Sequence, residues 1–546
     1  MPTLKIDQRE VEVPPGSTVL QAARQLGIDI PALCFLEGYP PSTSCLVCMV
    51  KILGSNRLAP SCGTAALDGM EIESETDEVH RVRRSALELL LSDHLGDCLA
   101  PCYLGCPAQM DIPQMLRQIV ASDLHGALVT VKNDIALPAV LGRICPAPCE
   151  KVCRRGAADA AVAICLLKRL VAAVDLASGD PYLPPCRPAT GKRVAIVGAG
   201  PAGLAAAYYL AQRGHTCTIF DENEKPGGRL LRETTAEQLP REVLEAEIQT
   251  ILRLGVEVHC GTLAGPDHSF RSLREEFDAV LVACGSGARQ QAESWGLKAS
   301  QRGIEVQPGT YQTSVEGVFA AGNAIRGKTL VVRSVADGKG AAVAIDQYLS
   351  GQHVTGVPEH FSTKIGRLEA DELKPLLTLS SASARQEPAG EGKGDGALFL
   401  ERCSAAPGVA EKSPAPFSGG YTLEEGAAQA ARCLHCDCRG LNSCKLRKYA
   451  ALYGARPRHY KAQRRTFQLD AQHAEVLFEP GKCIDCGLCI QIASAAREPL
   501  GLTFIGRGFD VRVGVPLSGS LAEALRTVAA QCVAACPTAA LAWKEK

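Results

Sequence analysis

The spacing of apolar and polar residues changes several times along the chain, and each change predicts a different kind of element. Residues 3–13 alternate as in a β-hairpin, and residues 18–27 then follow a helical spacing. Residues 80–98 predict an amphipathic helix, and residues 193–197 predict a buried parallel strand. From 353 to 418 the sequence becomes rich in Ser, Ala, Gly and Pro, which predicts a flexible linker. The pattern therefore predicts several domains.

The turn after the strand at 193–197 carries three glycines with a specific spacing. Gly198, Gly200 and Gly203 form a G-x-G-x-x-G sequence that leads directly into a helical run. In a dinucleotide cradle the first glycine permits the tight turn, the second lets the backbone approach a pyrophosphate, and the third lets the helix pack on the strand. Asp221 ends the next predicted strand, where an acidic side chain can hold ribose hydroxyls. We predict a dinucleotide site; the alternative is a glycine-rich turn with a purely structural role.

Length and composition limit the possible classes of protein. A chain of 546 residues with 46% hydrophobic residues has enough apolar material for three or more domains. The net charge of -1 does not favour nucleic acid or an anionic membrane surface as a partner. The 25 cysteines are the unusual quantity, and no secretory leader or long apolar run is evident. We therefore expect a cytoplasmic protein whose clustered cysteines bind metal.

The N-terminal cysteines predict a 2Fe-2S cluster. Their spacing is C-x10-C-x2-C-x13-C, with the ligands Cys34, Cys45, Cys48 and Cys62. Four thiolates suit such a cluster because each iron takes two. The alternative is that these are buried free cysteines. Residues 1–75 resemble the N-terminal domain of the large iron-sulfur subunit of complex I, which implies a β-grasp ferredoxin fold.

The next segment, 76–185, resembles two families in turn. His94 and Cys98 are similar to the His-x3-Cys start of a 4Fe-4S site in the complex I subunit. Residues 99–119 and 141–153 resemble the helical domain of the glutamate synthase small subunit and of dihydropyrimidine dehydrogenase, which implies two 4Fe-4S clusters. Carried over, one cluster would take Cys98, Cys102 and Cys153 together with His94 or another nearby group. The other would take Cys106, Cys145, Cys149 and a residue of the helix 161–170.

The last of these ligands departs from the family. The family has Glu or Gln where this chain has Lys168, and an ammonium group cannot bind iron. Cys165 lies one helical turn earlier, so we expect it to be the substitute ligand. The alternative is that Cys165 is a small core residue.

Residues 190–352 resemble the FAD half of the glutamate synthase small subunit. The resemblance rests on the first glycine turn, on Gly227 and Gly228 after the acidic strand end, and on Gly322 followed by Asn323, where that family usually has Asp. Asn keeps the hydrogen bonding, so FAD binding should survive. The family inserts an NAD(P)H domain between the late FAD motifs, whereas only a short segment follows residues 283–290 here, and Gln290 occupies the place of a third glycine. We expect an FAD site and no NAD(P)H domain.

The segment 419–460 begins with a capping box, Thr422 and Glu425, and ends in a compact set of cysteines. These cysteines are spaced as C-x2-C-x-C-x5-C, and they are Cys433, Cys436, Cys438 and Cys444. A 4Fe-4S cluster is the favoured interpretation; structural zinc and inert cysteines are the alternatives.

Residues 461–546 resemble a bacterial-type ferredoxin. One cluster would be completed by Cys483, Cys486, Cys489 and the remote Cys536. The second is broken, because Ala493 replaces its distant ligand and only Cys532 remains from the second cysteine run. We expect one 4Fe-4S cluster here, with Cys532 as a free thiol.

Taken together, these segments predict a multidomain α/β plus α+β chain with FAD, one 2Fe-2S cluster and three to four 4Fe-4S clusters. It would be the electron-transfer subunit of a cytoplasmic oxidoreductase complex. The expected partners are an NAD(H)-oxidising flavoprotein and a low-potential catalytic subunit, with ferredoxin as a further partner. Electron bifurcation at the FAD is a sharper hypothesis. A stand-alone NAD(P)H:acceptor oxidoreductase and a scaffold with a vestigial flavin fold are the alternatives.

Overall fold

The computed structural model describes residues 1–262, 269–380, 420–460 and 463–544. The chain folds into two compact units, each built from segments that are far apart in the sequence. Unit 1 consists of residues 1–100, 360–379 and 434–546, and unit 2 of residues 101–359 and 380–433. Both ends of the chain belong to unit 1, so the two segments of unit 2 lie between segments of unit 1 in the sequence.

The predicted linker is described only in its first part, since residues 381–419 lie outside the described residues. Within that first part, α16 (Ala370–Leu379) forms a helix. Leu373 of this helix is buried in a small apolar cluster of unit 1 with Leu95, Leu368 and Phe467. The structure therefore differs from the expectation of a linker that begins at residue 353: residues 360–379 belong to unit 1 because they carry apolar side chains that it buries.

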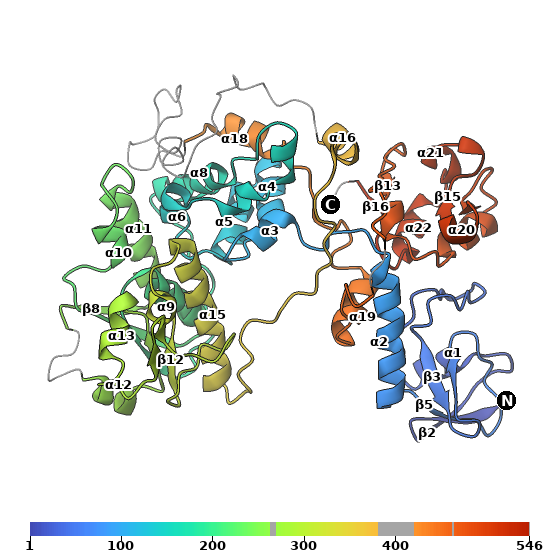
Figure 1. The fold of residues 1–546 in the computed structure, drawn as a ribbon, viewed down its shortest axis with the longest axis horizontal. Helices are drawn as coiled ribbons and strands as arrows, with labels where there is room; N and C mark the ends of the chain where they lie inside the picture. Colours follow the sequence, from blue (N-terminus) through green and yellow to red (C-terminus); the bar gives the residue numbers. More distant parts are fainter. Residues whose placement is uncertain (263–268, 381–419, 461–462, 545–546) are drawn as a thin grey trace. The chain divides into compact units, whose positions relative to one another are not determined.

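Unit 1 begins with a mixed five-stranded sheet in the order β2-β1-β5-β3-β4 (Figure 1). Its strands are β1 (Thr3–Ile6), β2 (Arg9–Glu12), β3 (Met49–Ile52), β4 (Arg57–Pro60) and β5 (Glu71–Glu73), and only the β1–β5 pair is parallel. α1 (Val19–Gln25) starts at a capping box formed by Thr18 and Gln21. Its buried Val19 and Leu20 share one core with Leu4 and Ile6 of β1.

A long helix and a buried arginine connect this sheet to later parts of unit 1. α2 (Asp77–Ser92) begins at Thr76, whose hydroxyl accepts the N–H of Val79. The fully buried Arg83 donates hydrogen bonds to the carbonyl of Met49 at 3.0 Å and to the hydroxyl of Tyr453 at 2.7 Å. Tyr453 ends α19 (Lys445–Leu452), so one guanidinium joins strand β3, α2 and α19.

The C-terminal part of unit 1 is a small α+β body. β13 (Val476–Phe478) pairs antiparallel with β16 (Leu541–Trp543), and α20 (Leu488–Ala495) packs against α22 (Ala529–Ala535). The remaining elements are the hairpin of β14 (Thr503–Ile505) and β15 (Arg512–Gly514), α21 (Leu521–Ala524), and the 3-10 turns η4 (Pro480–Lys482), η5 (Gly508–Asp510) and η6 (Pro516–Ser518).

Unit 2 begins with a helical part. Its elements are α3 (Pro101–Gly105), α4 (Ile112–Val120), α5 (Leu124–Lys132), α6 (Pro138–Ile144), α7 (Pro148–Lys151), η1 (Arg154–Ala157) and α8 (Ile164–Ala177). α18 (Leu423–Ala430), which lies far from these helices in the sequence, packs on α4 and α8. The fit is tight, since a Cβ on Gly426 would lie 2.3 Å from Leu170 Cδ2. The helical part is therefore completed by residues that come long after it in the chain.

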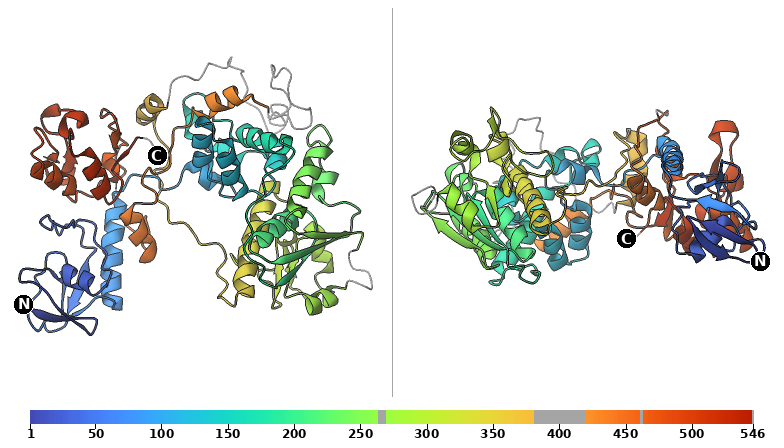
Figure 2. Two further views of the ribbon diagram at one scale, coloured as in Figure 1. Left: turned by 180° about the vertical axis from the view of Figure 1, so that it is seen from behind. Right: turned by 90° about the horizontal axis from the view of Figure 1, so that it is seen from below.

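The second part of unit 2 is a parallel sheet in the order β12-β9-β6-β7-β8. Its strands are β6 (Arg193–Val197), β7 (Thr216–Asp221), β8 (Glu257–Cys260), β9 (Ala279–Val282) and β12 (Val318–Ala320). The helix α9 (Pro201–Gln212) packs on α15 (Val331–Leu349), which runs beside the sheet in both further views (Figure 2, yellow). The shorter elements are α10 (Arg229–Arg232), α11 (Arg241–Leu252), α12 (Phe270–Glu276), η2 (Gly285–Gly287), α13 (Ala288–Gln291), β10 (Ala299–Ser300), β11 (Gly303–Ile304) and α14 (Asn323–Arg326).

Candidate iron-sulfur and flavin sites

The four N-terminal cysteines converge in unit 1. Cys34 Sγ lies 3.3 Å from Cys45 Sγ, and all four side chains are buried. Hydrogen bonds from the Cys45 and Cys62 thiols lower the pKa of Cys34, and a hydrogen bond from Cys62 lowers the pKa of Cys48 to about 7. Each thiol thus has another of the set within hydrogen-bond reach. Four converging sulfurs are the donor set that a 2Fe-2S cluster requires.

A second sulfur group in unit 1 combines residues that the sequence placed in different sites. The N–H of Cys438 donates to the carbonyl of Cys98 at 3.1 Å. Burial raises the pKa of the Cys444 thiol to about 12, and the nearby sulfurs of Cys438 and Cys98 contribute to the rise. Cys98 therefore lies with Cys438 and Cys444 in unit 1, whereas Cys102 and Cys153, its expected partners, belong to unit 2.

His94 lies beside this group. Its side chain is half-buried, its Nδ1 has no hydrogen-bond partner, and burial lowers its pKa to about 4. Lys482, whose Nζ is 4.0 Å from Cys438 Sγ, also lies next to His94, because a Cβ on Gly96 would be 2.9 Å from both His94 Nε2 and Lys482 Cε. A neutral imidazole with an unpaired nitrogen is suited to bind a metal.

The C-terminal cysteines line one pocket in unit 1. Its sulfur-bearing residues are Cys483, Cys486, Cys489, Cys532 and Cys536. The N–H of Asp485 donates to Cys483 Sγ at 3.4 Å and that of Leu541 to Cys536 Sγ at 3.5 Å, which are bonds of the kind that stabilise cluster thiolates. Burial raises the pKa of the Cys532 thiol to about 12. The predicted four ligands thus lie together, and the predicted free thiol lies beside them.

A further sulfur group lies in unit 2, between α6, α7 and α8. Cys165 Sγ is 3.4 Å from the carbonyl of Leu141, and a hydrogen bond to Cys145, followed by burial, raises the pKa of the Cys165 thiol. Burial also raises the pKa of Cys106 and Cys149, and the charges of these sulfurs act on one another. Cys106, Cys145, Cys149 and Cys165 therefore form one group, which is the set expected for the second twin cluster.

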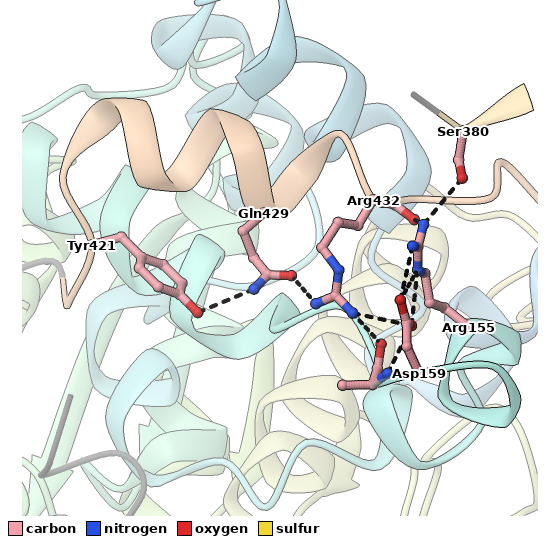
Figure 3. A network of polar contacts seen from close by, with 7 residues as sticks. Arg155, Asp159, Ser380, Tyr421, Gln429 and Arg432 are labelled. Atoms are coloured by element: carbon pink, nitrogen blue, oxygen red, sulfur yellow. Dashed lines mark hydrogen bonds and ion pairs between the residues drawn. The ribbon is translucent and has the colours of Figure 1, made fainter. Parts of the chain in front are cut away.

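Figure 3 shows how a polar network holds α18 on the helical part of unit 2. Arg155 donates to the carbonyl of Arg432 at 2.8 Å and pairs with Asp159, and Arg432 donates to Asp159 at 3.1 Å. The network also includes Ser380, Gln429 and Tyr421. Because Arg155 follows Cys153 closely and Arg432 precedes Cys433, these bonds hold the two cysteine segments together.

The four cysteines of the segment 433–444 therefore do not lie in one group. Cys433 lies in the main core of unit 2, against which Cys102 and Cys153 also pack. Cys436 packs beside Leu95 and Leu368 in unit 1, and Cys438 and Cys444 lie with Cys98. The spacing within the set gave no sign of this division. Among the described residues, no trio of His, Cys, Asp or Glu side chains is arranged to hold a single metal ion.

Four cysteine loops share an unusual backbone feature that sequence reasoning missed. A non-glycine residue with positive φ lies between the paired cysteines: Leu46 at 53°, Ala147 at 45°, His435 at 47° and Asp485 at 52°. Left-handed residues turn successive backbone N–H groups to one side and create a concave anion site, at a cost of roughly 1–3 kcal/mol each. The loops are therefore shaped to surround an anionic group such as a cluster with bridging sulfides. Their only sequence signal is the short cysteine spacing.

The predicted dinucleotide residues meet at the carboxyl ends of the parallel strands. A Cβ on Gly198 would lie 2.7 Å from the backbone of Ala283, and a Cβ on Gly203 would lie 1.9 Å from Gly198 O. A Cβ on Gly200, by contrast, would meet no atom within 4 Å, so space is left in front of the turn. This is the division of roles expected of a pyrophosphate cradle at a helix N-terminus.

The other predicted FAD residues lie around this turn. The buried Asp221 carboxylate accepts the N–H of Ala199 at 2.6 Å and that of Asn223 at 2.8 Å. A Cβ on Gly228 would be 3.0 Å from Gly200 Cα, and Gly227 precedes it with φ 132°. Gly322, which precedes Asn323, approaches the first turn of α9 so closely that a Cβ would lie 2.7 Å from Ala202 Cβ. The cradle is thus assembled from four separate loops.

Residues 283–320 contain no second nucleotide-binding sheet. In this fully described stretch β9 is followed by η2, α13 and the two-stranded β10–β11, and then by β12 of the same sheet.

Three known families match successive parts of the chain. Residues 1–77 match a 2Fe-2S iron-sulfur cluster binding domain, residues 93–179 match dihydropyrimidine dehydrogenase domain II with a 4Fe-4S cluster, and residues 196–257 match an NAD(P)-binding Rossmann-like domain. The prediction of a mixed α/β multidomain chain with these kinds of domain is confirmed.

Similar curated proteins are oxidoreductase subunits. The beta subunit of an NADP(+)-dependent formate dehydrogenase from Moorella thermoacetica is 40% identical over 207 residues, which are 34% of this chain and 29% of that protein. The beta subunit of an NADPH-Fe(3+) oxidoreductase from Geobacter sulfurreducens (strain DL-1 / KN400) is 37% identical over 38% of this chain and 30% of that protein. The glutamate synthase [NADPH] small chain from Bacillus subtilis is 35% identical over 35% of this chain and 38% of that protein.

The chain spans about a third of the length of these relatives. The likeness is consistent with the expected fusion of modules, and the matched domains are of the kinds that oxidoreductases carry, as the sequence predicted. None of the helices in the described ranges has the length and apolar character needed to cross a membrane.

Proposed function

We propose that this chain is the FAD- and iron-sulfur-containing electron-transfer subunit of a multisubunit oxidoreductase. The observation that carries the proposal is the combination of one nucleotide cradle, with no second one in residues 283–320, and several separate groups of buried cysteine sulfurs. Iron-sulfur clusters supply one-electron transfer, and FAD connects two-electron to one-electron chemistry. Such a chain is suited to distribute electrons between partners.

The sulfur groups support the following assignment. A 2Fe-2S cluster is held by Cys34, Cys45, Cys48 and Cys62, and 4Fe-4S clusters are held by the sets His94, Cys98, Cys438, Cys444; Cys483, Cys486, Cys489, Cys536; and Cys106, Cys145, Cys149, Cys165. Cys102, Cys153 and Cys433 are ligands of a further site in unit 2. The second set differs from the sequence prediction, because His94 and Cys98 now share a site with Cys438 and Cys444.

The packing of unit 1 supports electron transfer among three of these sites. Cys34, Cys444 and Cys486 contribute to a single apolar core. Ser42 donates a hydrogen bond to the carbonyl of Cys486 at 2.9 Å, and the Cys34 sulfur is close enough to add to the raised pKa of Cys486, after burial and Cys536. One apolar core that joins three sulfur groups keeps the distances between their cofactors short.

The expected partners supply functions for which the described residues show no site. They are a flavoprotein that oxidises or reduces NAD(H), a low-potential catalytic subunit, and ferredoxin as a further electron carrier. The relatives named as beta subunits favour a role inside a complex over a stand-alone enzyme.

Stopped-flow mixing of the purified full chain with NADH or NADPH tests this proposal. An electron-transfer subunit should contain FAD and iron, and its flavin should not be bleached rapidly by either nucleotide. Rapid bleaching would establish the alternative of an NAD(P)H:acceptor oxidoreductase. A chain that contains iron and no FAD would establish the scaffold alternative.

Electron bifurcation at the FAD is a narrower hypothesis within this proposal. It requires that oxidation of one donor by the assembled complex be coupled to ferredoxin reduction. The hypothesis fails if the complex transfers electrons without any coupled reduction of ferredoxin.

A further inference from the structure

The helix α19 has one exposed face, and this face is basic. Lys445, Lys448 and Leu452 follow one another at spacings of three and four residues, which places them on one side of the helix, and all three are exposed. The other side carries Leu446 and Tyr449, which are buried. The helix therefore packs into unit 1 with one side and presents the other side to solvent.

The sequence around this face carries charge of one sign. Residues 439–460 contain six lysines and arginines and no aspartate or glutamate, although the net charge of the whole chain is -1. Arg456 and Arg458, in the segment that follows α19, are exposed like the two lysines of the helix. The near-neutral total thus conceals a local excess of positive charge.

Neighbouring carboxylates do not neutralise this excess. Asp29 lies 4.0 Å from Lys448, and both side chains are mostly exposed, so the pair contributes little. Glu88 of α2, which packs beside α19 (Figure 1), is 3.8 Å from Arg456 and only 4% exposed. Arg458 forms no ion pair with any of the residues that the structure describes. These cations remain available to a partner.

The buried side of α19 adjoins the sulfur groups of unit 1. Cys444 precedes the helix, and its Sγ accepts the N–H of Arg447 at 3.4 Å. Tyr449 lies in one apolar core with Cys444, Cys34 and Cys486. A helix with its side chains is about 10–12 Å across. A protein bound to the exposed side would therefore be separated from this core by α19 alone.

The combination of cations and an exposed leucine favours a protein as the partner. Leu452 is 68% exposed, and Lys448 lies one helical turn before it. An apolar centre with a charged rim is typical of protein interfaces, whereas phosphate backbones are held mainly by cations. A surface with several cations and few carboxylates is complementary to an acidic one. The partner is therefore expected to be an acidic protein.

We propose that the exposed face of α19, together with Arg456 and Arg458, docks a small acidic electron-carrier protein of the ferredoxin class. The reduced carrier gives up one electron, an oxidised iron-sulfur cluster of unit 1 accepts it, and no bond forms or breaks. Opposite charges speed the encounter, and the apolar centre excludes water from the contact. This inference rests on the proposed function, because it requires clusters behind α19.

The experiment measures binding of an oxidised, strongly acidic two-cluster ferredoxin to the oxidised full chain by calorimetry, at low salt and at about 1 M salt. K448E and R458E should each weaken binding by about tenfold at low salt. At high salt this difference should fall below about twofold, because the screening length is then only about 3 Å. L452S should weaken binding at both salt concentrations, since the contribution of an apolar contact does not depend on charge.

Arg57 offers a matched control, because it is an exposed arginine on β4 of the same unit. R57E changes the net charge by the same amount as R458E and should bind the ferredoxin like the wild type. Equal weakening in R57E would mean that only the total charge matters, and it would overturn the assignment of the surface. Wild-type binding in both K448E and R458E would overturn it as well.

Two further measurements separate this inference from the function on which it rests. A short DNA duplex and vesicles with anionic lipid should not bind; binding of either one that K448E and R458E abolish, without binding of ferredoxin, would overturn the choice of partner. The rate at which the reduced ferredoxin reduces the chain is then followed by stopped flow. If the ferredoxin binds as expected and transfers no electron, the docking surface stands and the electron-transfer function fails.

Discussion

Two glycines of the same turn should respond differently to the same substitution. Gly200 has φ −79° and ψ −177°, which any residue adopts, and its added methyl group would meet nothing within 4 Å. G200A should therefore fold normally, with a free energy of unfolding within about 1 kcal/mol of the wild-type value, because the entropic gain of Ala opposes its poorer fit at the N-cap of α9. The methyl group would, however, occupy the space in which a pyrophosphate approaches the backbone.

The expected loss of FAD affinity can be estimated from the hydrogen bonds to phosphate that G200A would remove. A backbone N–H bond to a charged phosphate contributes about 1.5–3 kcal/mol, and each 1.4 kcal/mol is tenfold in affinity. Losing one such bond should weaken FAD binding by about ten- to a hundredfold. The assay is FAD per chain after purification, together with rebinding of FAD to flavin-free protein.

Gly203 provides the matched structural control. Its added Cβ would lie 1.9 Å from Gly198 O, so α9 must move away from β6. Such overpacking costs about 1–3 kcal/mol or more, and G203A should lose thermal stability as well as FAD. Wild-type FAD content in G200A would refute the assignment of the cradle, and wild-type stability in G203A would refute the packing argument.

Three further predictions concern other parts of the chain. C532A should keep the C-terminal 4Fe-4S cluster, whereas C536A should lose it, as measured by iron content; equal loss in both would show that Cys532 is a ligand. Glu247 is buried and accepts two N–H groups at the start of α6, and burial raises its pKa to about 7. Because the folded state binds the proton more tightly than the unfolded state, its contribution to stability should fall as pH rises from about 4.5 to 7 and stay low above that, so E247Q should flatten this part of the unfolding profile. R155A should free α18 from the helical part of unit 2, with faster amide exchange in residues 420–433; unchanged exchange would contradict the role of the network in Figure 3.

The local elements of this protein could be predicted closely from its sequence. The predicted strand 193–197 is β6, and the three glycines perform the separate packing roles expected of them. The four N-terminal cysteines and the four cysteines predicted as C-terminal ligands also lie together, as their spacing predicted. These signals depend on neighbours within a few residues or on one compact domain, so a single sequence carries them.

The sequence by itself determined which residues are candidates to bind metal and nucleotide, and only the tertiary structure decided which of these candidates lie together. Cys98 lies with Cys438 and Cys444, and Cys433 lies in the core with Cys102 and Cys153, because unit 2 is inserted within unit 1 and α18 returns to pack on α4 and α8. Spacing along the chain cannot report such groupings, since the free energy that selects them comes from burying apolar surface between segments that the sequence keeps far apart.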